Sequence, residues 1–141
     1  MYLLEKEYER YIKVIGGAVV SSENPNLEIK KIRTSLSIRQ EDIATLLGLR
    51  RETISRIENG SICPTFTFVR RFSELVALAK VVRDLEALSE IKIPGGDIDM
   101  PNLKLLLFRL NASPDALTLI SKLSERGYQK SRDKILKSSL I

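Results

Sequence analysis

The sequence contains no histidine and only one cysteine among its 141 residues. Without histidine, the chain lacks the commonest general base and the commonest metal ligand in proteins. A single cysteine provides neither an intramolecular disulfide nor a zinc site built from several thiolates. We therefore expect no enzyme activity, no metal site and no cofactor, and we interpret the acidic residues Asp97 and Asp99 as parts of a loop.

The sequence also lacks any apolar run long enough to span a membrane, and its N-terminus shows no secretory pattern. We therefore expect a cytoplasmic protein with no membrane partner. Hydrophobic residues make up 43% of the chain, which is enough to build a core. The net charge of +5 favours a polyanionic partner, such as double-stranded DNA in the nucleoid.

The most informative segment runs from residue 38 to residue 60 and predicts two short helices joined at a glycine. Ile43 and Leu47 share one helical face, and Gly48 follows them at a position typical of a helix end. Leu49 is expected to fill the space between the two helices. Ile54 and Ile57 then give the second helix its buried side. This arrangement is typical of a helix-turn-helix, which binds the DNA major groove.

Two flanking segments predict the helices that such a small unit needs for support. Residues 27–36 predict a helix before the motif. Residues 65 to about 83 predict one after it, with Thr65 as the N-cap. The solvent side of the second motif helix, at about residues 50–59, carries polar side chains that suit base recognition: Arg51, Glu52, Ser55 and Arg56.

With these features, the sequence from about Leu27 to Leu78 resembles the lambda-repressor/Cro family of DNA-binding domains, also called the XRE family. The matching segments are 29–33, 40–44, 47–48 and 54–60, followed by Pro64. The flanking segments are also similar to a group of archaeal proteins in which a helix precedes this domain. The resemblance implies an all-α, lambda-repressor-like helix-turn-helix bundle. To that bundle we add an N-terminal helix and a C-terminal helical extension.

The resemblance also implies roles for individual residues. In the family, the positions of Arg51, Glu52, Ser55 and Arg56 read bases. The positions that contact the DNA backbone are Gln40, Arg50, Thr53 and Asn59. Arg33 and Glu58 match a buried structural ion pair. Arg39 and Arg50 depart from the family pattern, which often has small polar residues there, and they add positive charge.

The chemistry of two of these residues leaves alternatives open. Glu52 can accept a hydrogen bond from cytosine N4, or it can pair with Arg56 one helical turn later. Gln40 can contact a phosphate, or it can simply be solvated at the N-terminus of its helix.

The segments before and after the motif predict further helices. Residues 1–15 predict a helix that either continues through Gly16 and Gly17 to Val20 or gives way to a strand over 12–20. After Pro64, one apolar stripe should close the core of the domain: Phe68, Phe72, Leu75, Ala79 and Val82. A second stripe lies on another face, at Leu78, Val81, Leu85 and Leu88. We expect this helix to reach about Ile91, and the second stripe to be covered by the C-terminal segment or by another subunit.

The C-terminal third begins with turn residues between Pro94 and Pro101. Residues 101–110 are ambiguous between helix and strand, a helix is predicted from Ser113 to Arg126, and a short last helix lies near Ile135. The resulting division is an N-terminal arm (1–24), a DNA-binding domain (25–92) and a dimerisation segment (93–141). We interpret the basic residues between 126 and 137 as a solvated helix face or a mobile tail, with contacts to DNA phosphates as the alternative.

Cys63 is interpreted as a small apolar residue tucked under the loop after the motif, with a redox role as the alternative. For the whole chain we expect a sequence-specific transcription regulator. It would act as a homodimer on a two-fold operator whose half-sites lie about one helical turn apart, roughly 34–36 Å. One alternative is a cofactor resembling the multiprotein bridging factors. Another is the antitoxin of a toxin–antitoxin pair, with the C-terminal segment binding the protein partner.

Overall fold

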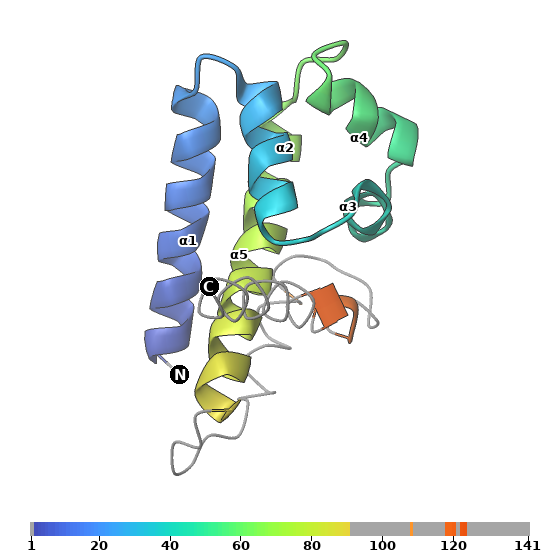
Figure 1. Cartoon of the computed structure of the whole chain (residues 1–141). Coiled ribbons are helices and arrows are strands. Elements are labelled where there is room, and N and C mark those ends of the chain that lie inside the picture. The colour runs from blue at the N-terminus through green and yellow to red at the C-terminus, as the bar shows by residue number, and fades with distance from the viewer. Residues whose placement is uncertain (1, 91–107, 109–117, 121, 124–141) are drawn as a thin grey trace, which may run out of the picture.

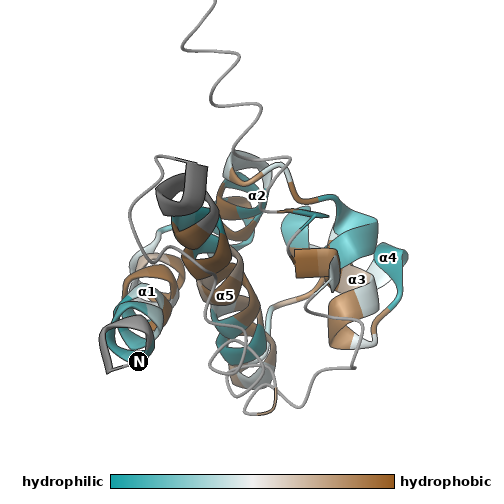
Figure 2. Ribbon diagram, turned by 90° about the horizontal axis from the view of Figure 1, so that it is seen from below, coloured by the Kyte–Doolittle hydropathy of each residue, from teal (hydrophilic) through white to brown (hydrophobic). Residues whose placement is uncertain are grey.

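The computed structural model describes residues 2–90, 108, 118–120 and 122–123. Its helices are α1 (Tyr2–Ser21), α2 (Pro25–Ser35), α3 (Gln40–Leu47), α4 (Arg51–Glu58) and α5 (Phe66–Glu90). No strand occurs among these residues. The predicted all-α helix-turn-helix bundle is confirmed, with α3 and α4 lying on one side of α5 and α1 lying on the other (Figures 1 and 2).

Helix α1 is continuous across Gly16 and Gly17, so the predicted helix is confirmed and the alternative strand over 12–20 is wrong. Glycine disfavours a helix interior by roughly 1 kcal/mol relative to alanine, which means that packing must compensate. At Gly16, a Cβ atom would lie 3.5 Å from the Ser73 hydroxyl oxygen of α5. That distance is an ordinary van der Waals contact, so the two helices pack closely here and a small side chain at this position would still fit.

The boundaries of the central helices follow local signals in the sequence. Pro25 occupies the first turn of α2, where its missing N–H costs nothing. Helix α3 begins with the Arg39 N–H donating to the Asp42 carboxylate at 3.0 Å. It ends at Gly48, whose φ of 67° lies in the left-handed region. The Thr65 side chain accepts a hydrogen bond from the Phe68 N–H at 3.0 Å, so the predicted N-cap of α5 is confirmed.

Helix α5 is buried on more faces than the sequence stripes indicated. The first stripe is buried as predicted, with Phe72 and Val82 fully inaccessible to solvent. In the second stripe, Leu78 and Val81 are also buried within the single chain, so their burial requires no other subunit. A third face, which includes Ser73 and residues near Asp84, packs against α1. The 25-residue α5 is the central helix of those described (Figure 2). None of the described helices is both long and apolar enough to cross a membrane.

Two residues of the C-terminal third join the same core. Ile120 and Leu123 belong to the same cluster of buried hydrophobic side chains as the helices above, and the described residues between 118 and 123 are helical, as the predicted helix over 113–126 requires. Phe108 is helical and exposed. The rest of the 101–110 segment, the turn near Pro94 and the last predicted helix lie outside the described residues.

A polar contact fixes the register of α1 against α5. The Tyr11 hydroxyl donates a hydrogen bond to the Asp84 carboxylate. The Arg10 guanidinium and the Lys80 ammonium lie 4.9 Å and 5.0 Å from the centre of the Tyr11 ring. Such cation–π contacts are favourable when the cation faces the ring. Burial and the Asp84 hydrogen bond together raise the pKa of Tyr11 to about 12.

This contact should make the protein less stable in alkali. An unfolded tyrosine has a pKa of about 10, so the stabilisation from Tyr11 is complete below that pH and is lost as the pH rises towards 12. We expect the free energy of unfolding, measured in urea between pH 9 and 12, to fall less steeply for Tyr11→Phe than for the wild type. Equal slopes for the two proteins would contradict the assignment of this pKa to Tyr11.

Candidate nucleic-acid interface

A tight turn joins helices α3 and α4. The Leu49 N–H donates to the Ala44 carbonyl at 2.8 Å, which closes the end of α3 behind Gly48. Ile43 and Leu47 of α3 are buried, together with Ile54 of α4. These buried residues fix the angle between the two helices, and the opposite side of α4 is left facing solvent.

A buried ion pair holds the end of α4 on α2. The Arg33 guanidinium donates to both carboxylate oxygens of Glu58, at 2.7 Å and 2.8 Å, and to the Ile38 carbonyl at 2.8 Å. Arg33 and Glu58 are 8% and 3% exposed. A planar, bidentate arrangement of this kind fixes orientation as well as distance. The pair therefore sets where the recognition helix lies relative to the rest of the bundle.

Gln40 joins this ion pair. Its side-chain amide donates to the same Glu58 carboxylate, at 3.1 Å, so that a residue at the start of α3 contacts the end of α4. Sequence reasoning missed this contact, because its two interpretations for Gln40 were a phosphate contact and solvation. Nothing local in the sequence marks it, since the partner lies 18 residues away. The role of Gln40 toward a DNA phosphate stays a prediction.

The C-terminal end of α4 is fixed by two asparagines. The Asn59 side-chain oxygen accepts hydrogen bonds from the Ser61 N–H and hydroxyl, at 2.9 Å and 2.6 Å. The Asn26 amide donates to the Glu58 carbonyl at 3.3 Å, and sequence reasoning did not single out this residue. The loop after α4 is therefore held close to the start of α2.

The four residues predicted to read bases lie together. Arg51, Glu52, Ser55 and Arg56 line one shallow hollow on the solvent side of α4. Among the described residues, no hydrogen bond or ion pair engages any of these four side chains. The alternative in which Glu52 pairs with Arg56 is therefore absent from this structure. Arg33 and Gln40 both donate to Glu58, whereas the four side chains around the hollow have no such partner among the described residues and can meet a ligand.

A second hollow adjoins the first through Arg51, which lines both. It lies where the N-terminal ends of α3 and α4 meet, and its remaining lining residues are Arg33, Arg39, Gln40 and Glu41. The structure thus brings Arg39 and Gln40 next to the four residues predicted to read bases, on the same side of the motif. Such a basic surface is suited to polyanionic ligands.

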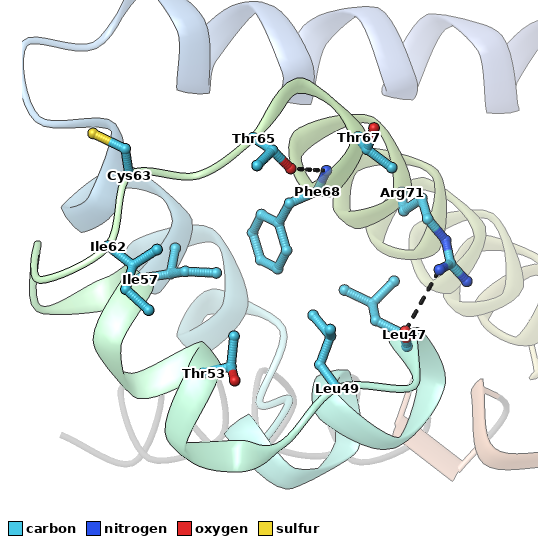
Figure 3. A pocket seen from close by; sticks show the side chains of 10 residues that line it. All are labelled: Leu47, Leu49, Thr53, Ile57, Ile62, Cys63, Thr65, Thr67, Phe68 and Arg71. Carbon is cyan, nitrogen blue, oxygen red and sulfur yellow. Dashed lines mark hydrogen bonds between the residues drawn. The ribbon is translucent and has the colours of Figure 1, made fainter.

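Two residues near the motif lie differently from what the sequence suggested. Thr53 lines a groove on the inner side of α4, away from the residues of the first hollow. Cys63 is exposed, and in Figure 3 its sulfur points away from the neighbouring side chains, so the interpretation as a tucked apolar residue is wrong. The loop is short and its backbone passes over the groove, which leaves the Cys63 side chain on the outside.

Comparison with known proteins adds one finding. Residues 29–79 match the protein-family model described as helix-turn-helix. This match spans α3, α4, most of α2 and the first half of α5, a little over one third of the chain. No curated protein and no solved structure matches the chain.

Proposed function

We propose that this chain, whose residues 29–79 form a helix-turn-helix domain of the lambda-repressor (XRE) type, is a sequence-specific transcription regulator. In this proposal the recognition helix, at about residues 50–59, enters the DNA major groove. The observation that carries the proposal is the set of four unengaged polar side chains around one hollow of α4. A buried ion pair at the other end of the helix holds that surface in a fixed orientation.

The chemistry of the four side chains suits base edges. Arg51 and Arg56 each present a guanidinium fork, which can donate two hydrogen bonds to guanine O6 and N7. Glu52 forms no hydrogen bond or ion pair with Arg56 in the described structure, so its carboxylate is available to accept from cytosine N4. Ser55 lies between them and can donate or accept. We therefore expect a half-site that contains guanine–cytosine pairs.

The DNA backbone contacts are assigned to Gln40, Arg50, Thr53 and Asn59, of which Thr53 lies on the other side of α4 from the four residues of the hollow. Arg39 adds a further positive charge to the same surface, at a position where the family often has a small polar residue. Contacts of this kind fix the register of a protein on DNA but carry no sequence information themselves. The net charge of +5 adds long-range attraction to DNA.

We further propose that the protein acts in the nucleoid as a homodimer on a two-fold operator. Since Leu78 and Val81 are buried within one chain, the second stripe of α5 no longer supports a dimer. The support comes from the size of the domain, which suits one half-site of a two-fold operator. The C-terminal segment stays a candidate for the dimer contact.

The experiment that tests both proposals is the selection of binding sites from fragmented genomic DNA by the full chain, at several salt concentrations. We expect a short inverted repeat with half-site centres about one helical turn apart. A single, non-repeated half-site would contradict the dimer but support sequence recognition. Equal binding of all fragments, with an affinity that collapses as salt rises, would contradict the function and favour a bridging or architectural role.

A further inference from the structure

A groove with a volume of about 260 Å³ lies on the inner side of α4, behind the surface proposed to meet DNA. Its walls come from the turn between α3 and α4, from α4 itself, from the loop after α4 and from the first turns of α5 (Figure 3). Of the residues assigned to DNA contacts, Thr53 alone reaches it. The groove is thus a separate site within the same domain.

The lining of this groove is mostly apolar and incompletely covered. Leu49 and Ile62 are 39% and 38% exposed, although Leu49 was expected to fill the space between α3 and α4. In Figure 3 the Phe68 ring lies between the two sides of the groove, with Ile57 and Ile62 on one side and Leu47 and Leu49 on the other. A small apolar molecule placed here would remove Leu49 and Ile62 from water, which is favourable in proportion to the area covered.

Arg71 gives the groove a charge preference. Among the described residues that line it, Arg71 is the charged one, and none of the others carries a carboxylate. Its guanidinium donates one long hydrogen bond, 3.5 Å, to the Leu47 carbonyl, and no described ion pair neutralises it. A guanidinium has five N–H donors in a planar fork whose geometry matches a carboxylate. Most of these donors stay available to a ligand.

We propose that this groove binds a small monocarboxylic acid with an apolar body. The carboxylate would pair with Arg71, and the apolar body would lie against Leu49, Ile62 and Phe68. The volume is just below the usual range for drug-sized ligands, which favours a short acid over a peptide or a large cofactor. The ligand would contact α4 and α5 together, between the recognition helix and the helix that supports it.

The binding test uses the full chain, without DNA, and follows backbone amide signals by NMR. The probes are octanoate, 1-octanol and octylamine, which share a chain length and differ in charge. We expect octanoate to bind saturably, with the largest shifts at Leu49, Ile62 and Arg71, and to bind more tightly than the other two. No saturable binding of octanoate, or equal affinity for octylamine, would overturn the proposal. Because no DNA is present, the outcome is independent of the proposed regulatory function.

Variants separate the role of Arg71 from a general charge effect. Arg71→Gln should weaken octanoate binding roughly tenfold or more, as expected for the loss of a charge-assisted contact, and should leave 1-octanol binding unchanged. Arg70→Gln is the matched control, because the side chain of its neighbour Arg70 is 82% exposed and pairs with Glu74, outside the groove. Equal effects of the two variants would overturn the assignment.

A second variant keeps the test decisive if Arg71→Gln does not fold. Ile62→Asp places a negative charge at a partly exposed position in the groove, where the fold should tolerate it. It should abolish octanoate binding through repulsion, and it should increase the affinity for octylamine through attraction. Octanoate binding that persists in Ile62→Asp would show that the acid binds elsewhere.

Discussion

Replacement of Arg33 by methionine should lower the free energy of unfolding by about 3–5 kcal/mol, the usual cost of removing one partner of a buried ion pair. The loss is large because Glu58, only 3% exposed, would keep a charge without its bidentate partner. The Ile38 carbonyl would also lose its donor. Gln40 would still donate one hydrogen bond to Glu58, but a neutral amide cannot balance the carboxylate. Urea denaturation of the wild type and the variant measures the difference.

The double variant Arg33→Met/Glu58→Leu is the control for this prediction. It removes both charges, so it should recover much of the stability lost in Arg33→Met. If the single variant proves as stable as the wild type, the pair is not buried in solution as it is in the structure. If the double variant is no more stable than the single one, the cost lies in packing and not in an unbalanced charge.

The double variant Arg51→Ala/Arg56→Ala should lose preference for the selected operator and yet fold normally. Each arginine is free of intramolecular partners in the described structure, so its removal leaves no buried group unpaired. A bidentate arginine–guanine contact discriminates against other bases by about 1–3 kcal/mol, so the ratio of specific to non-specific affinity should fall about tenfold or more. Competition binding with the operator and a scrambled duplex, at fixed salt, measures this ratio.

A charge-matched control tests whether the loss reflects specific contacts. Arg10→Ala/Arg70→Ala removes two exposed arginines, one from α1 and one from α5, that line neither of the two hollows at the recognition helix. It should weaken binding to both duplexes alike and leave the specificity ratio unchanged. Should the two double variants behave in the same way, Arg51 and Arg56 would be shown to act through charge alone.

The boundaries of the central helices could be predicted because their signals are local. Gly48 ends α3 and Thr65 caps α5, and each signal lies within a few residues of the feature that it marks. The start of α2 was placed at Leu27, two residues too late, because Pro25 was read as part of a loop although proline suits the first turn of a helix. The alternation of apolar residues likewise placed Ile43, Ile54 and Phe72 in the core. These features depend on backbone conformation and on one helical face, which a single sequence displays directly.

The contacts between distant segments could not be predicted in the same way. Gln40 and Asn26 are ordinary polar residues at helix starts, and their bonds to Glu58 depend on how three helices come together. The face of α5 that packs against α1 was hidden because it includes Ser73, Lys80 and Asp84, which suggest a solvent side; of the three, Ser73 is buried. Ser73 is buried against α1 near Gly16, and Tyr11 pairs with Asp84 across the same interface.

The course of α5 also bears on how this molecule can be divided into fragments. The family match ends at residue 79, but that point falls inside α5, next to the buried residues Val81 and Val82. A polypeptide trimmed to residues 29–79 would cut the helix within its most buried part. It would also strip α1 from the face around Ser73 and expose apolar surface to water. The portable unit for expression or for grafting onto another protein is therefore longer than the motif, and it includes α1 and the whole of α5.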